Sequence, residues 1–209
     1  MSTEPKSFHF SAPIVSPDDP HANTIAAAIV GIEDQLGERR GWDRPTQLFT
    51  LRLLPGDLVE TALYPQHLWC PGGFNPADAL DKLAAPLPPV PDLLPPADAA
   101  QATVCAVGFM FEGWTRDSTV ALPPHLARRA QRGERVNHLV SGRREIRIVH
   151  AVDLNQRVFH AVRTRGEAQS RMKNAGLRST AKEGIIPAAV ARIMHAMRCG
   201  HRVLPGQPA

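Results

Sequence analysis

The sequence predicts an α+β fold, an antiparallel sheet of about four strands with an N-terminal and a C-terminal helix packed on it. Three observations favour this class. Residues 143–165 have the pattern of a β-hairpin, residues 102–112 form a highly apolar strand, and amphipathic helices are indicated near both ends of the chain. The regular alternation of strands and helices that a doubly wound parallel sheet requires is missing.

The hairpin is the strongest local signal. Residues alternate in polarity along 146–153 and again along 158–165, with the period of two expected of strands that bury one face. A three-residue loop at 154–156 pairs His150 with His160 and keeps the two faces distinct. A two-residue loop pairs His150 with Ala161 and places Arg163 on the apolar side. We therefore predict the three-residue loop, a common hairpin connection.

This register gives the hairpin two different faces. One face is apolar apart from the two facing histidines. The loop requires a residue in the left-handed region, which Asn155 tolerates. The other face is predicted to point outward and is lined by Arg147, Arg157, Arg163 and Arg165.

The N-terminal part of the chain is predicted to be a flexible arm over residues 1–18, followed by a helix that begins near Pro20. Gly37 and Gly41 end this helix. Three acidic residues, Glu33 among them, are expected to lie off its apolar stripe. The stripe consists of Ile25, Ile29, Ile32 and Leu36.

The middle of the chain contains one clear strand, residues 47–54, whereas residues 58–71 remain ambiguous. A short helix is expected to begin at Asn75 and Pro76. Residues 86–96 contain six prolines and are interpreted as a stiff connector, with a ligand for an aromatic-lined groove as the alternative. The strand at 102–112 is apolar on both faces, which predicts a central position in the sheet.

The remaining segments are more polar. Residues 115–142 allow at most a short helix after Pro124, and residues 167–182 are basic and largely without pattern. A closing helix is predicted over 184–198, with Gly200 beyond its end. Residues 203–209 are expected to be a disordered tail. Residues 19–202 therefore form one predicted domain.

Composition indicates a soluble intracellular protein. The chain has 209 residues, 43% of them hydrophobic, which allows a substantial core. Its three cysteines are unclustered and fit the reducing cytoplasm better than a disulfide framework. The N-terminus lacks the apolar run of a signal peptide, and no stretch approaches the length of a membrane span.

Charge is distributed unevenly along the chain. Residues 1–122 carry 7 Lys and Arg against 15 Asp and Glu, whereas residues 125–182 carry 14 against 4. Such asymmetry bears on the choice of partner rather than on the fold. The basic half is expected to engage an anionic partner, an acidic protein surface or nucleic acid, or to pair with the acidic half within one chain or between two.

The segment GWDRPTQLFTL at residues 41–51 follows an acidic amphipathic helix. Later come a strand with Arg144-Glu145-Ile146-Arg147 and a strand ending in residues 160–165, HAVRTR. These blocks, with a final apolar helix, resemble an uncharacterised actinobacterial protein family that carries a Gly-Trp-Asp-x-Pro-x-x-Leu-Phe signature. The basic segments at 128–135 and 171–182 depart from that pattern, which suggests a phage or mobile-element member. The resemblance implies a source and a fold but no catalytic residue.

Histidines and cysteines provide the candidates for metal binding or catalysis. His150, His160 and Cys105 share one predicted sheet face, where they could ligate zinc or form a Cys–His nucleophile. The alternative is half-buried histidines beside a small apolar cysteine. Two half-sites with chelate-like spacing, at residues 67–70 and 199–201, are either a zinc clamp or solvated loop residues.

No phosphate-binding glycine loop and no nucleophile elbow is present in the sequence. The preferred hypothesis is therefore a non-enzymatic binding or regulatory protein. The alternative is a metal-dependent or Cys/His enzyme that uses the His150, His160 and Cys105 face. The arginines expected to contact the partner are Arg147, Arg157, Arg163, Arg165, Arg128 and Arg129.

Overall fold

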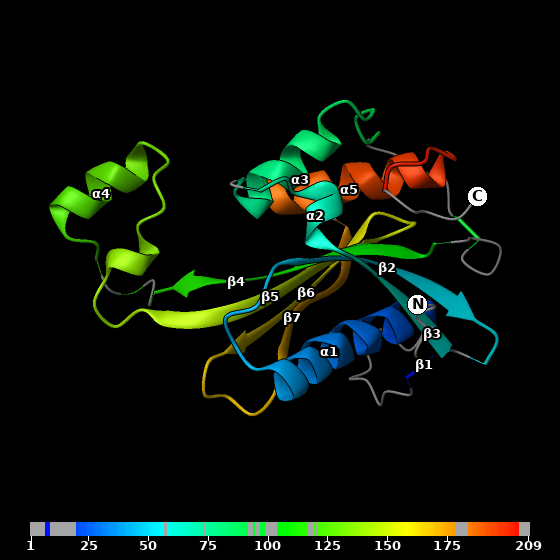
Figure 1. Ribbon diagram of the computed structural model, residues 1–209, viewed down its shortest axis with the longest axis horizontal. Coiled ribbons are helices and arrows are strands. Elements are labelled where there is room, and N and C mark those ends of the chain that lie inside the picture. The colour runs from blue at the N-terminus through cyan, green and yellow to red at the C-terminus, as the bar shows by residue number, and fades with distance from the viewer. Residues whose placement is uncertain are drawn as a thin grey trace.

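The computed structural model describes residues 7–8, 20–56, 58–72, 74–91, 94, 97–98, 104–116, 119, 121–178 and 184–204. These residues build one antiparallel sheet with helices on both of its faces (Figure 1). Most of the predicted N-terminal arm and residues 205–209 of the predicted tail lie outside the described residues. The predicted α+β class is confirmed.

The sheet has the order β1-β3-β2-β4-β5-β6-β7, and every neighbouring pair is antiparallel. The prediction of about four strands was too low. β3 lies in the ambiguous segment, and β7 is an edge strand whose sequence, RMKNAGLR, lacks apolar alternation. The bounds are β1 (Ser7–Phe8), β2 (Gln47–Leu54), β3 (Leu58–Tyr64), β4 (Ala106–Thr115), β5 (Arg144–Asp153), β6 (Arg157–Thr164) and β7 (Arg171–Arg178).

The β5–β6 hairpin has the predicted register. His150 pairs with His160, and residues 154–156 form the three-residue loop. The residue with positive φ is Gln156, at 60°, rather than Asn155. The side chain of Asp153 fixes the loop, because its Oδ1 accepts hydrogen bonds from the backbone N–H groups of Asn155 and Arg157. With this Asx-type turn, the residue in the left-handed region lies one position later than the sequence predicted.

Helices cover the sheet from two sides. On one side lies α1 (Pro20–Arg40), and on the other lie α2 (Gln66–Trp69), α3 (Pro76–Ala84) and α5 (Ile185–Arg198) (Figure 1). The predicted Asn75 cap of α3 is confirmed, since its side chain accepts a hydrogen bond from the N–H of Ala77. No helix among the described residues combines the length and the apolarity needed to cross a membrane.

Two further helical segments, α4 (Pro124–Gln131) and the 3₁₀-helix η1 (Asn137–Leu139), lie between β4 and β5. They sit beyond the end of these strands, apart from the helices that cover the sheet (Figure 1). β4 itself is central, between β2 and β5, as the sequence predicted. The connection from β4 to β5 is therefore a separate projection at one end of the molecule.

The proline-rich segment adopts no helix or strand at its described positions, yet it belongs to the body of the protein. Leu87 and Val90 pack against the core, and Arg192 of α5 donates hydrogen bonds to the carbonyls of Ala85 and Leu87. The predicted start of the disordered tail at residue 203 is too early, because Leu204 is buried in the same core. These contacts fix the segment on α5 rather than leaving it as a free spacer.

We expect Ile193→Asp in α5 to lower the free energy of unfolding by several kcal/mol, because Ile193 is fully buried and the new carboxylate would have no partner. Chemical denaturation followed by circular dichroism measures this change. Ile185→Asp at the start of the same helix is the matched control, since Ile185 is 60% exposed. Equal stability of parent and Ile193→Asp would contradict the packing of α5.

Candidate functional site

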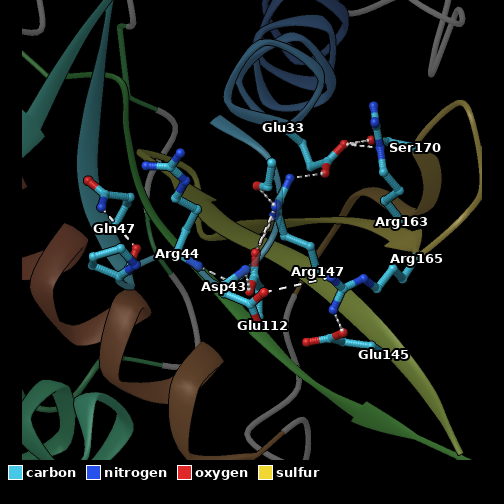
Figure 2. Close-up of polar contacts among 12 residues, drawn as sticks. Glu33, Asp43, Arg44, Gln47, Glu112, Glu145, Arg147, Arg163, Arg165 and Ser170 are labelled. Carbon is cyan, nitrogen blue, oxygen red and sulfur yellow. Dashed lines mark hydrogen bonds and ion pairs between the residues drawn. The ribbon is translucent and has the colours of Figure 1, made fainter. Parts of the chain in front are cut away.

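The polar centre of the fold is the guanidinium group of Arg147 in β5, which is fully buried (Figure 2). Its Nη1 donates to Oε1 of Glu33 in α1 at 3.1 Å. Its Nε and Nη2 donate to Oε1 of Glu112 in β4 at 3.0 and 2.7 Å, and Nη2 also donates to the carbonyl of Gly41 at 2.6 Å. One arginine therefore joins a helix, a turn and two strands. Such a buried cation requires this degree of hydrogen bonding.

Glu112 also holds the turn that follows α1. Its Oε2 accepts hydrogen bonds from the backbone N–H of Asp43 at 2.8 Å and of Arg44 at 3.2 Å. The turn passes through the left-handed region at Gly41 and Asp43, with φ of 70° and 68°. Glycine adopts this conformation without strain, and Asp tolerates it. The Gly-Trp-Asp segment therefore has a structural role, because its backbone binds Glu112 and Arg147.

Arg163 in β6 extends the network beside Arg147. Its Nε lies 2.8 Å from Oε2 of Glu33, and its Nη2 donates to Asp34. Ser170, in the connection between β6 and β7, donates to Glu33 as well. Glu33 thus balances two arginines from two strands. The prediction that Glu33 lies off the buried side of its helix was wrong, because its side chain is fully buried.

Arg165 forms the outer part of the network. It pairs with Glu145 and lies 3.7 Å from Asp43, and its guanidinium carbon is 5.6 Å from the Trp42 ring centroid. The carbon of the Arg147 guanidinium lies 4.7 Å from the same centroid, so Trp42 covers both arginines.

Asp43, Glu112 and Glu145 bring their carboxylates within 4.8 Å of one another, the one arrangement among the described residues with the spacing of a metal site of three or more ligands. Each of these carboxylates already faces Arg147 or Arg165. The guanidinium groups supply the positive charge there, which accounts for the convergence of the carboxylates without an ion.

The hairpin face predicted to point outward is instead the face that α1 covers. Arg147 is fully buried and Arg163 is 7% exposed, so both are corrected from open surface to interior positions. Arg157 pairs with Asp153 at 2.6 Å across the hairpin loop. Of the four arginines predicted on this face, only Arg165 is exposed. The acidic N-terminal half supplies the counter-charges of Arg147 and Arg163, the intramolecular pairing that the charge asymmetry allowed.

The two histidines face each other on the opposite side of the sheet. Their ring centroids are 4.3 Å apart, and His150 also stacks on Phe111. Burial, and secondly the neighbouring His160, lower the pKa of His150 to about 3. Burial also lowers the pKa of His160, followed by the charge of Lys173. Both imidazoles are therefore held in the neutral form.

Cys105 does not join these histidines. It lies four positions from Phe109, the residue that pairs with His150, or roughly 13 Å along a strand. Its thiol donates to the carbonyl of Leu51, and burial raises its pKa to about 12. A thiol with so high a pKa is a poor nucleophile and a poor metal ligand. The half-sites at 67–70 and 199–201 do not meet in any potential metal cluster of the described residues either.

A second cluster of arginines occupies the projection between β4 and β5, residues 121–144, which we call the arginine extension. It has its own small core, formed by Leu126, Val136 and Val140. The amide nitrogen of Asn137 donates to the carbonyl of Trp114 and ties the extension to the end of β4. The extension is therefore a folded unit of the described chain. It carries Arg128, Arg129, Arg132, Arg135, Arg143 and Arg144 against one acidic residue, Glu134.

The arginines of the extension are accessible to solvent, unlike Arg147 and Arg163. The side chains of Arg132 and Arg135 are 63% and 65% exposed. Arg129 and Arg132 share Glu134, whose pKa is lowered by hydrogen bonds from Arg129 and then Arg132. Arg135 lies 3.9 Å from Asp78 of α3, an exposed pair that solvent screens. Within the described residues, Arg128 and Arg144 are exposed without a carboxylate in ion-pair contact.

The function of the chain is inferred from this geometry, because comparisons with known proteins give no match. No protein-family model matches the chain, and searches of curated proteins and of solved structures found no match.

The burial of Glu33, the role of Glu112 and the separate arginine extension were not predicted from the sequence. Glu33 follows Ile29 by four residues and therefore falls on the apolar stripe of its helix, which was an available signal of burial. Glu112 had no such signal, because its partner lies on a neighbouring strand. Arg128 and Arg129 were selected as partner-binding residues, but only the structure separates them from the buried arginines.

We expect Arg147→Met to lower the free energy of unfolding by about 3 kcal/mol or more, because Glu33 and Glu112 would lose their shared buried cation. Urea denaturation measures the change. Arg52→Met is the control, since Arg52 is half exposed and lies 3.8 Å from Glu60. Its loss should cost no more than about 0.5 kcal/mol. Similar stabilities for the two variants would show that the network contributes little.

The histidine pair should make stability fall in mild acid. Because the pKa of His150 is about 3 in the folded chain, the unfolded chain binds one more proton between pH 6.5 and 3. The contribution of His150 to the free energy of unfolding then falls by about 1.4 kcal/mol per pH unit as pH decreases. His150→Phe should lose about 2 kcal/mol less than the parent between pH 7 and 5. Urea denaturation at both pH values tests this, with exposed His138→Phe as the control. Parallel profiles for parent and His150→Phe would contradict it.

Proposed function

We propose that this protein is a non-enzymatic binding protein whose arginine extension engages an anionic partner. The observation that carries the proposal is the difference between the two groups of arginines. Arg147 and Arg163 are buried in ion pairs with the acidic half of the chain. The extension, with α4, instead lies at one end of the molecule (Figure 1), and it carries six arginines with a single glutamate among them.

The shape of the extension supports binding. A small core of its own holds α4 and the following turn, so the arginines are presented on an ordered support instead of a free chain. An ordered surface loses less conformational entropy on binding. The other hairpin arginines are expected to contribute little to binding of an anionic partner, since Arg157 and Arg165 already have acidic partners in Asp153 and Glu145.

The alternative of an enzyme on the His150, His160 and Cys105 face receives less support. The two histidines stack on each other, but Cys105 is about four strand positions away and its pKa is raised by burial. The residues that carry the resemblance to the actinobacterial family, such as Trp42 and Arg147, meet in the buried network. That resemblance therefore supports a shared scaffold and adds no catalytic group.

Retention on immobilised heparin, a sulfated polyanion, tests the proposal with the full chain. We expect Arg128→Glu combined with Arg132→Glu to elute at clearly lower salt than the parent, because both side chains are exposed. Arg52→Glu combined with Lys82→Glu changes the net charge equally at exposed positions outside the extension. Equal losses of retention in the two double variants would show that net charge alone governs binding and would overturn the proposal.

A further inference from the structure

The arginine extension carries a more specific inference, which rests on the function proposed above. We infer that its partner is a nucleic acid, bound through the phosphate backbone without preference for base sequence. This partner is favoured by the residue types of the extension, the stacked pair at its base, the ion pairs of the buried carboxylates and the small amount of apolar surface on the extension.

All six basic residues of the extension are arginine, and none is lysine. The guanidinium group is a planar fork that binds phosphate in a bidentate manner, whereas the lysine ammonium acts as a point charge. Arg128 and Arg129 lie in α4, Arg132 follows its last residue, and Arg143 and Arg144 begin the return into β5. The arginines thus lie on both chain segments of the projection and can contact several phosphates at once.

An aromatic side chain stands at the base of this surface. Trp114 near the end of β4 is 41% exposed, and the guanidinium carbon of Arg143 lies 4.9 Å from its ring centroid. The stack holds Arg143 in place, while part of Trp114 stays exposed to solvent. Indole rings and guanidinium planes are the surfaces on which unstacked nucleic acid bases stack. A single such pair adds affinity but cannot read a sequence.

The acidic half of the chain would repel a polyanion if its carboxylates were free. The structure instead shows three of its carboxylates, Glu33, Asp34 and Glu112, paired with Arg147 and Arg163. These carboxylates lie in the body of the protein, and the ion pairs cancel their charge. The extension keeps a net positive charge, with six arginines against Glu134 and a solvent-screened contact from Arg135 to Asp78.

An acidic protein is the competing partner, and the apolar surface argues against it. Protein interfaces have an apolar centre surrounded by a polar rim. The extension uses its aliphatic residues for its own core, and its exposed large apolar residues, with those of the adjoining strand end, are Leu139 and Trp114. A strongly positive surface with so little apolar area matches the polar interfaces formed with nucleic acid.

Fluorescence anisotropy with a labelled 20-bp duplex of mixed sequence tests this inference, with a 20-nucleotide single strand in parallel. Titrations of the full chain between 50 and 200 mM salt should give a slope of log K against log salt of about −4, as expected for four to five neutralised phosphates. A second duplex of unrelated sequence should bind within about threefold, because phosphate contacts carry no sequence information.

Two variants locate the contact. Arg128→Glu with Arg132→Glu should weaken binding at least tenfold and reduce the magnitude of the slope by about 2. Arg135→Glu with Arg144→Glu, on the returning segment, should act in the same direction. The charge-matched Arg52→Glu with Lys82→Glu should keep a slope close to that of the parent, and thermal melting checks that each variant is folded.

A labelled polyglutamate peptide of 20 residues separates this inference from the proposed function. Binding of duplex or single strand in preference to polyglutamate, lost in both extension variants, supports the inference. Binding of polyglutamate with no binding of either nucleic acid at 50 mM salt overturns it, while the proposed function stands. Binding of none of the probes overturns both. Nucleic acid binding that the extension variants leave unchanged also overturns the inference.

Discussion

The fold depends on the burial of one cation, Arg147, between two carboxylates that come from opposite ends of the acidic half. Glu33 reaches it from α1 and Glu112 from β4, and the carbonyl of Gly41 completes its hydrogen bonds. Burial of these charged groups is unfavourable unless all of their hydrogen bonds form together. The position of α1 on the sheet, the turn after it and the pairing of β4 with β5 are consequently linked through a single side chain.

This constraint also explains how one chain holds an acidic and a basic half. Arg163 and Arg165 repeat the arrangement of Arg147 toward the surface, with Asp34 and Glu145 as partners. Acidic and basic residues that lie far apart in the sequence therefore form ion pairs within the body of the protein. A group of exposed arginines remains in the extension, where β4 and β5 run past the helices.

Local patterns predicted much of the fold. The hairpin register followed from alternation alone, and the bounds of β2 and the cap at Asn75 followed from apolar spacing and from Pro and Asn preferences. β7 could not be found, because an edge strand needs no apolar alternation. The site was harder, since a strand pattern shows which residues share a face but not what covers it. The arginine face of the hairpin was thus assigned to solvent although α1 packs on it.

The way the extension joins the sheet has a consequence for how such a protein can change. β4 and β5 stay paired up to Thr115 and Arg144, so the chain leaves and re-enters the sheet about 5 Å apart on either side of the connection that contains the extension. A short turn could close that gap. The extension contributes no residue to the buried network of Arg147, Glu33 and Glu112, and we expect changes within it to leave that network intact. The charge of the extension and the stability of the fold can in this way change separately.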